Sequence, residues 1–300
     1  MNDKIVKGIT KNKEIRFFAS QATETVSKVA ELHELSTTNT VLMGRMITAA
    51  AMLASDLKNA KDNLSLKIDA DGLSGKAIVT ATKNGDVKAY MRNPSNEFPL
   101  KNKQFDLATA LGDGYLTIIK DIGMKNPYVG QVELRYKTIA QDLTYYFVQS
   151  EQIPSSVGLG VLIFPGGKVR QAGGFIVQLM PGASENTISK LEDNLRKFPN
   201  YTDVMDMGYD SQQIIEKFIL KDLRPVIKDT QDFRYRCNCS KTKFAGGLKM
   251  LEKSELEDMI CQNKTIKVDC HFCNTTYEFT PAELEEILAE KKIISKNLPK

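Results

Sequence analysis

The first part of the chain shows two kinds of apolar pattern. Residues 23–35 carry apolar side chains near helical spacing, and residues 40–57 form a long apolar stretch that predicts a buried helix capped by Thr40. Alternating segments follow, separated by the turn dipeptides Asp71-Gly72 and Asn84-Gly85, which indicates an antiparallel meander. The strands predicted here are 64–70, 76–82, 87–91, 115–120, 129–136, 157–164 and 175–180, with a further helix around 142–150.

Residues 183–230 differ in composition from the segment before them. They hold 7 Lys/Arg and 9 Asp/Glu, and they predict two helices, 184–198 and 211–220, interrupted by Pro199 and Pro225. We interpret this segment as a charged helical linker. A solvated helical hairpin is the favoured form, and the alternative is a marginally stable connector, because short charged helices depend on packing elsewhere.

Residues 231–300 predict a small separate module. Capping-box patterns at Ser254 and Thr280 each predict the start of a helix, and two short strands, 265–269 and 275–279, lie between them. The fold class predicted for the whole chain is α+β. Its three expected parts are a mixed α/β core domain with antiparallel strands (1–182), the charged helical linker (183–230) and a small C-terminal domain (231–300).

Composition and charge narrow the class of protein. Hydrophobic content of 42% and charged content of 26% are typical of globular chains, and the net charge of 41 − 37 = +4 indicates no strongly charged partner. Residues 1–20 lack the apolar core of a signal peptide, and Arg45 and Asp56 interrupt the apolar stretch 41–57, which is too short to span a membrane. We therefore expect a cytoplasmic protein with no membrane partner, and structural disulfides are uncommon in that compartment.

The cysteines carry the candidate chemistry. All five lie in the last quarter of the chain, and four of them form two close pairs, Cys237 with Cys239 and Cys270 with Cys273. Two such pairs brought together by folding supply four sulfurs to one tetrahedral Zn²⁺ per chain in the reduced form, so all four are predicted zinc ligands. His271 is a competing ligand, but soft thiolates suit a closed zinc site better. Cys261 is interpreted as a small buried hydrophobe, with a resolving or regulatory thiol as the alternative.

Several activities lack support in the sequence. The sequence Pro165-Gly166-Gly167-Lys168 resembles the end of a phosphate loop, but the upstream glycine position is Leu162 and Val169 replaces the Ser or Thr, so no nucleotide is expected. A four-thiolate zinc has no open position for water, and no other catalytic motif occurs, so we expect no enzymatic activity. Residues 231–300 hold 12 Lys/Arg and 11 Asp/Glu, which argues against strong binding of nucleic acid.

Closely spaced zinc thiolates can sense oxidants. Zinc keeps the sulfurs deprotonated, and neighbouring thiols can condense with a sulfenic acid into a disulfide. Because a small zinc module depends on its metal for folding, such a site couples redox state to folding. A purely structural zinc is the alternative interpretation.

The residues resemble one family, that of the 33 kDa heat-shock proteins, which are redox-regulated holdase chaperones. The resemblance spans the chain and is carried by 150–155 (Ser-Glu-Gln-Ile-Pro-Ser), the charged linker, 235–240 (Tyr-Arg-Cys-Asn-Cys-Ser) and 270–274 (Cys-His-Phe-Cys-Asn). The chain departs at 240–243 (Ser-Lys-Thr-Lys), where many members have an acidic-basic pair, and at the helix-weakening Gly246-Gly247.

The resemblance implies a mechanism and a set of partners. The reduced, zinc-bound chain would be inactive. Oxidant together with unfolding stress would form redox-active disulfides Cys237–Cys239 and Cys270–Cys273, zinc would leave, and the linker and zinc domain would unfold. The activated chain would hold unfolding client proteins without ATP as part of a stress response, as a homodimer. Two other classes stay open from the residues alone: a zinc-ribbon nucleic-acid-binding protein, from the pI of 8.6, and a thiol–disulfide oxidoreductase, from the Cys-X-X-Cys.

Overall fold

The computed structural model describes residues 3–100 and 105–296, with the side chains of the last helix described as far as Lys291. It divides the chain into two compact units, residues 1–236 and 237–300. The first holds two mainly antiparallel sheets with helices, and the second holds the cysteines, so the predicted α+β class is confirmed. The segment predicted as a linker lies inside the first unit. A separate functional role for it stays a prediction.

Two sheets build the first unit. Sheet A runs in the order β10-β1-β2-β9-β8, and every neighbouring pair is antiparallel. Its strands are β1 (Lys4–Thr10), β2 (Ile15–Gln21), β8 (Ser155–Ile163), β9 (Val169–Leu179) and β10 (Pro225–Asp232). Sheet B runs in the order β11-β5-β4-β3-β6-β7, and β11 pairs in parallel with β5. Its strands are β3 (Asn63–Ala70), β4 (Ala77–Thr82), β5 (Asp86–Met91), β6 (Gly114–Asp121), β7 (Tyr128–Glu133) and β11 (Arg234–Tyr235).

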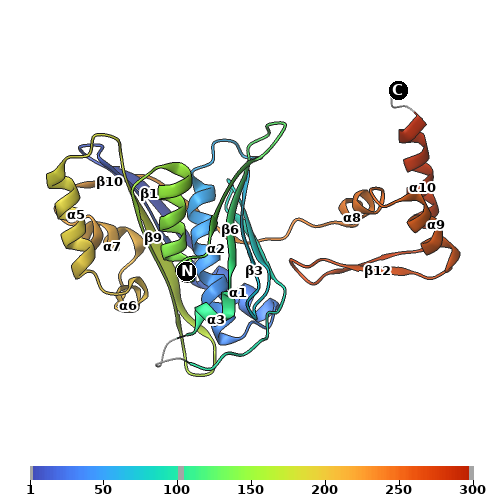
Figure 1. The fold of residues 1–300 in the computed structure, drawn as a ribbon, viewed down its shortest axis with the longest axis horizontal. Helices are drawn as coiled ribbons and strands as arrows, with labels where there is room; N and C mark the ends of the chain where they lie inside the picture. Colours follow the sequence, from blue (N-terminus) through green and yellow to red (C-terminus); the bar gives the residue numbers. More distant parts are fainter. Residues whose placement is uncertain (1–2, 101–104, 297–300) are drawn as a thin grey trace. The chain divides into compact units, whose positions relative to one another are not determined.

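Helix α2 (Thr37–Ser55) lies between the two sheets (Figure 1), which confirms the predicted buried helix. Its side chains share one core with residues of both sheets, such as Ile176 and Leu66. The helix begins earlier than predicted, because the Ser36 side chain accepts a hydrogen bond from the Asn39 amide and caps it. Beside it lie α1 (Thr23–Leu32), α3 (Leu107–Leu111) and α4 (Ala140–Tyr146), which continues as the π-helical turn η1 (Phe147–Glu151).

Truncating a side chain of α2 tests how much this core depends on it. Leu42 is fully buried, so Leu42→Ala is expected to lower the free energy of unfolding by about 2–5 kcal/mol. Urea unfolding of the full chain measures this value. Leu73→Ala is the matched control, because Leu73 is 56% exposed and its loss should cost no more than about 0.5 kcal/mol. Equal losses for the two variants would contradict the packing described.

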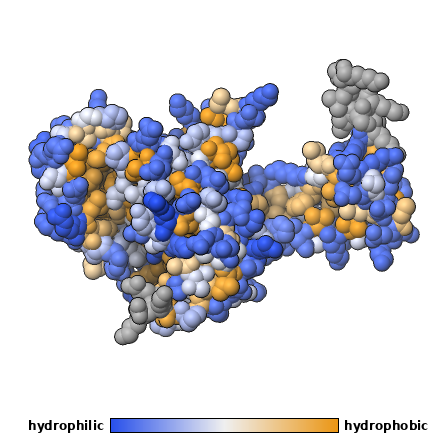
Figure 2. All heavy atoms as spheres, viewed as in Figure 1, coloured by the Kyte–Doolittle hydropathy of each residue, from blue (hydrophilic) through white to orange (hydrophobic). Residues whose placement is uncertain are grey.

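The charged segment covers the outer face of sheet A. Its elements are α5 (Glu185–Lys197), α6 (Tyr201–Asp206), α7 (Ser211–Ile214) and the π-helical turn η2 (Ile215–Ile219). Leu191, Ile215 and Ile219 pack there on Phe17 and Phe175 of the sheet. Hydrophilic residues lie on the outside of this segment and hydrophobic ones toward the sheet (Figure 2). The favoured interpretation as a solvated hairpin is therefore wrong: the helices bury an apolar face.

The second unit is small. Its elements are α8 (Lys241–Leu248), α9 (Lys253–Cys261), the hairpin strands β12 (Ile266–Asp269) and β13 (Thr276–Phe279), and α10 (Pro281–Lys296). Its core consists of Leu248, Leu256, Phe279, Leu284, Ile287 and Leu288. Thr280 caps α10 as predicted, because its hydroxyl accepts from the Glu283 amide. Helix α9 begins before Ser254, because Glu252 and Glu255 form its first capping contact. Within the described residues, no helix combines the length and apolar character that a membrane crossing needs.

Candidate metal centre

Two half-sites of the second unit supply the four sulfurs. Cys237 and Cys239 lie in the extended segment before α8, where the Ser240 side chain accepts from the Lys243 amide and fixes the start of the helix. Cys270 and Cys273 lie in the turn that joins β12 to β13. The Cys273 amide donates to the Cys270 carbonyl at 3.1 Å, which makes the turn tight and brings both sulfurs to one side.

The four sulfurs form one cluster, which we call the thiol cluster. All four Sγ atoms lie within 4.8 Å of one another. Two contacts join the half-sites: the Cys237 and Cys270 sulfurs are 3.8 Å apart, and the Cys239 and Cys273 sulfurs are 3.3 Å apart. A tetrahedron with zinc–sulfur bonds of about 2.3 Å has edges of about 3.8 Å. The spacing and the soft donor set therefore fit one Zn²⁺ held by the four predicted ligands.

The two other candidate residues lie outside the cluster. The exposed His271 contributes no atom to it. Cys261, at the end of α9, is exposed, so the interpretation of Cys261 as a small buried hydrophobe is wrong. A neighbour that the sequence did not indicate is Tyr277 of β13, whose hydroxyl lies 3.1 Å from the Cys239 sulfur. This contact raises the pKa of Tyr277 to about 12, so the phenol stays protonated and can donate to the sulfur.

The thiols differ in how readily they lose a proton. Burial raises the pKa of Cys237 to about 12 and also raises the pKa of Cys270. Burial opposes ionisation of Cys273 as well, but hydrogen bonds with the Thr275 hydroxyl and amide outweigh it and lower the pKa to about 7. Without a bound cation, two of the thiols are therefore protonated at neutral pH. A divalent metal must displace these protons to bind.

The segment that leads into the thiol cluster is anchored to both sheets of the first unit. We call residues 225–236 the strap. It pairs with β1 through β10 and with β5 through β11, and the Arg236 amide donates to the Val87 carbonyl at 2.8 Å. Arg236 is followed directly by Cys237. The last anchor of the strap is thus one residue from the first cysteine of the thiol cluster.

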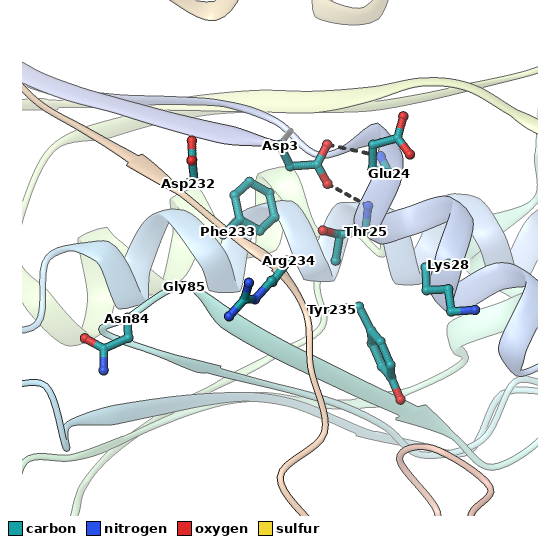
Figure 3. A pocket seen from close by; sticks show the side chains of 10 residues that line it. All are labelled: Asp3, Glu24, Thr25, Lys28, Asn84, Gly85, Asp232, Phe233, Arg234 and Tyr235. Atoms are coloured by element: carbon teal, nitrogen blue, oxygen red, sulfur yellow. Dashed lines mark hydrogen bonds between the residues drawn. The ribbon is translucent and has the colours of Figure 1, made fainter. Parts of the chain in front are cut away.

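Between its two strands, the strap closes one side of a cavity of about 700 Å³ (Figure 3). Phe233, which is 4% exposed, packs into the core there, and its amide donates to the Asp3 carbonyl at 3.1 Å. The Asp3 carboxylate accepts from the Glu24 and Thr25 amides at 3.0 and 2.6 Å and so caps α1 (Figure 3). The sequence does not indicate the contact between Phe233 and Asp3, because the two residues lie 230 positions apart.

A two-sheet α+β unit followed by a four-thiol unit defines a class of protein, and comparison with known proteins identifies it. The model of the Hsp33 protein family matches residues 3–280. The chain belongs to the Hsp33 family, as its resemblance to the 33 kDa heat-shock proteins predicted.

Individual relatives agree along their whole length. A 33 kDa chaperonin of Agathobacter rectalis is 42% identical over 288 residues, which cover 96% of this chain and 100% of the relative. A 33 kDa chaperonin of Geobacillus kaustophilus is 38% identical and is also matched over 100% of its length, with 97% of this chain covered. The crystal structure of the 33 kDa chaperonin of Thermotoga maritima superposes with a TM-score of 0.87 at 33% identity, covering 98% of this chain and 100% of that one.

Proposed function

We propose that this chain is a redox-regulated, ATP-independent holdase that keeps thermally unfolding and oxidatively damaged proteins from aggregating in the cytoplasm. The observation that carries the proposal is the thiol cluster, which is joined directly to a strap that holds both sheets. Its relatives are named chaperonins, which supports client proteins as partners and a role other than enzymatic catalysis. The reduced, zinc-bound chain is the inactive form, and the activated chain is a homodimer that uses no nucleotide and binds neither nucleic acid nor membrane.

Oxidation acts on the thiol pairs. One thiolate of a pair attacks a peroxide oxygen, the O–O bond breaks, and a sulfenic acid and hydroxide form. The second thiolate attacks the sulfenic sulfur and displaces a second hydroxide, so the two sulfurs lose two electrons as the S–S bond forms. The two hydroxides take up protons from the solvent, and one peroxide is thus reduced to two waters. When bound, zinc keeps the sulfurs deprotonated and joins the half-sites. Two disulfides use all four ligands, so the metal is lost with them.

Loss of the metal ligands affects the first unit because the second unit is covalently joined to the strap. Six buried hydrophobic side chains form the core of the second unit over residues 237–291, whose side chains the structure describes. This is a small core, so the unit depends on the metal that joins its half-sites. Its unfolding leaves β11, which is only two residues long, as the nearest anchor of the strap. Release of β11, and then of β10, detaches from sheet A the strand that directly follows the covering helices α5 to η2 in the chain.

The surface uncovered in this way is apolar. Beneath α5, α6, α7 and η2, the outer face of sheet A presents Val6, Ile15, Phe17, Phe175 and Val177, all at most 6% exposed. A contiguous apolar sheet face of this kind is typical of surfaces that bind other proteins. We therefore infer that clients are held on this face once the covering helices have moved away.

The test of the proposed function is suppression of client aggregation. Light scattering of a thermally unfolding client is followed with the reduced, zinc-loaded chain and with the peroxide-oxidised chain. The oxidised chain is expected to suppress scattering at stoichiometric amounts, and the reduced chain to leave it unchanged. Cys261→Ser is the control variant, because this exposed thiol lies outside the cluster and should switch normally. Equal suppression by both redox forms would defeat the proposal.

The disulfide pairing gives a separate prediction. Sulfurs of different half-sites lie 3.8 and 3.3 Å apart, yet we expect Cys237–Cys239 and Cys270–Cys273. Unfolding stress during oxidation separates the half-sites, whereas the cysteines of each pair stay two or three positions apart in the chain. Peptide mapping by mass spectrometry of the oxidised chain measures the pairing. Disulfides between the half-sites, Cys237–Cys270 and Cys239–Cys273, would instead show that the folded cluster is oxidised in place.

A further inference from the structure

Strand β10 is held at the edge of sheet A chiefly by its backbone. It pairs antiparallel with all of β1, from Lys4 opposite Asp232 to Thr10 opposite Pro225. Most of its side chains are exposed, so they contribute little apolar burial. The contact is close: a Cβ on Gly8 would lie 2.1 Å from the Val226 carbonyl oxygen. The edge of β1 is therefore a site for an extended chain, and it selects mainly for backbone shape.

One side-chain feature of this edge carries charge. The Lys7 and Lys83 ammonium groups both donate to the carbonyl of Ser55, the last residue of α2, each at 2.6 Å. Two cations thus meet at the negative end of a buried helix. Burial, and then the charge of Lys7, lower the pKa of Lys83, as expected for two cations held close together.

Strand β10 supplies the carboxylate that balances this pair. Asp229 lies opposite Lys7 in the register, and its carboxylate is 3.2 Å from the Lys7 ammonium. The other carboxylate close to Lys83 is Asp56, which is itself bound to Arg16 at 3.4 Å. Departure of β10 would therefore leave a strand edge without a ladder partner and two lysines without their nearest free carboxylate.

We propose that, in the activated chain, the edge of β1 binds extended segments of client proteins by strand addition, and that Lys7 and Lys83 favour segments with a carboxylate where Asp229 stood. This inference rests on the proposed function and names its client mode. Strand addition uses main-chain hydrogen bonds that any unfolded sequence can offer, whereas one charged position adds selectivity. In the reduced chain, β10 itself occupies this edge as an extended strand with a carboxylate beside Lys7.

A labelled peptide with the sequence of residues 225–232 tests the proposal by fluorescence anisotropy with the full chain. The oxidised chain is expected to bind it at least about tenfold more tightly than the reduced chain, because β10 occupies the edge in the reduced chain. The Asp229→Lys version of the peptide should bind the oxidised chain about tenfold more weakly. In the Lys83→Gln chain this difference should shrink to about threefold or less, and in the control Lys76→Gln chain, altered on sheet B, it should persist.

Backbone methylation of the peptide tests strand addition itself. In a β-ladder, alternate amides face the partner strand, and residues 229–232 pair with β1 without a register shift. Peptides methylated on the amides of Asp229 and Gln231, or on those of Thr230 and Asp232, should therefore differ in affinity by about tenfold or more. Equal affinities would overturn the inference, and so would a dimer in which β10 of a second copy occupies the edge and excludes the peptide. If the oxidised chain protects clients but binds no peptide, only this inference fails. If it protects no client, the proposed function fails first.

Discussion

Replacing Cys270 with serine is expected to unfold residues 237–300 while the first unit stays folded. Cys270 is the most buried of the four candidate ligands, at 4% exposure, and structural zinc contributes about 10–16 kcal/mol in small zinc peptides. The six described residues of the apolar core bury too little surface to replace a stabilising free energy of that size. Hydrogen exchange should show β12 and β13 losing their protection in Cys270→Ser, and atomic absorption should show zinc content falling from one per chain to near zero.

Chelation of zinc from the unmodified chain should give the same exchange pattern, which separates loss of metal from any effect of the serine. Cys261→Ser is the matched control and should keep both zinc and protection, because Cys261 is exposed at the end of α9. If β12 and β13 stayed protected in Cys270→Ser, the metal would not be what keeps this unit folded.

Replacing Phe233 with alanine is expected to release the strap without oxidation. Phe233 is 4% exposed, and truncating a buried phenylalanine costs about 3–5 kcal/mol. The ladders on either side are short or exposed, so they cannot compensate for this loss. In the reduced, zinc-loaded Phe233→Ala chain, amides of β1 and β10 should exchange faster, and client aggregation should be partly suppressed.

Phe164→Ala is the control for this substitution, because Phe164 is 45% exposed and lies outside the strap. It should change stability by no more than about 0.5 kcal/mol and leave the reduced chain inactive. A Phe233→Ala chain that loses stability throughout the first unit, with β10 no faster than the rest, would show that Phe233 supports the whole core and not the strap.

The elements that the sequence predicted correctly are those whose signal is local. The buried helix α2 is apolar on nearly every side, and the meander β3-β4-β5 contains its own turn dipeptides. The start of α2 was placed too late because Ser36, Thr37, Thr38 and Thr40 all suit a cap. Contacts of the Ser36 amide and the Asn39 side chain with the Pro94 carbonyl select Ser36 among them. Such a contact is invisible in the sequence.

Elements that depend on distant partners were missed. Strands β1, β2 and β10 were not predicted: β1 carries two lysines, and β10 is a half-exposed edge strand without an apolar alternation. The burial of Ile215 and Ile219 was not predicted, because charged residues surround them in the sequence. Their helical face is apolar because it packs on the outer face of sheet A, and the sequence does not show that contact.

The candidate metal ligands were predictable because a closed tetrahedral zinc site takes four ligands, and four cysteines lie in two close pairs. The exposure of Cys261 was not predicted, although helix geometry accounts for it. It is five positions after the buried Leu256, hence about 140° around the axis of α9 and off its buried face. Tyr277 and Phe233 could not be found from spacing. Tyr277 is placed by the pairing of β13 with β12, and Phe233 lies between β10 and β11, whose ladders fix its position.

The central claim is that sulfur ligation, folding of the strap and client protection change together. One peroxide titration of the full chain tests it, with zinc release, free thiols, hydrogen exchange of β10 and client light scattering measured on the same samples at a temperature that favours unfolding. We predict that four thiols and one zinc are lost per chain over the same range of peroxide in which β10 loses protection and clients become protected. Client protection that rises while zinc and β10 stay in place would contradict the account.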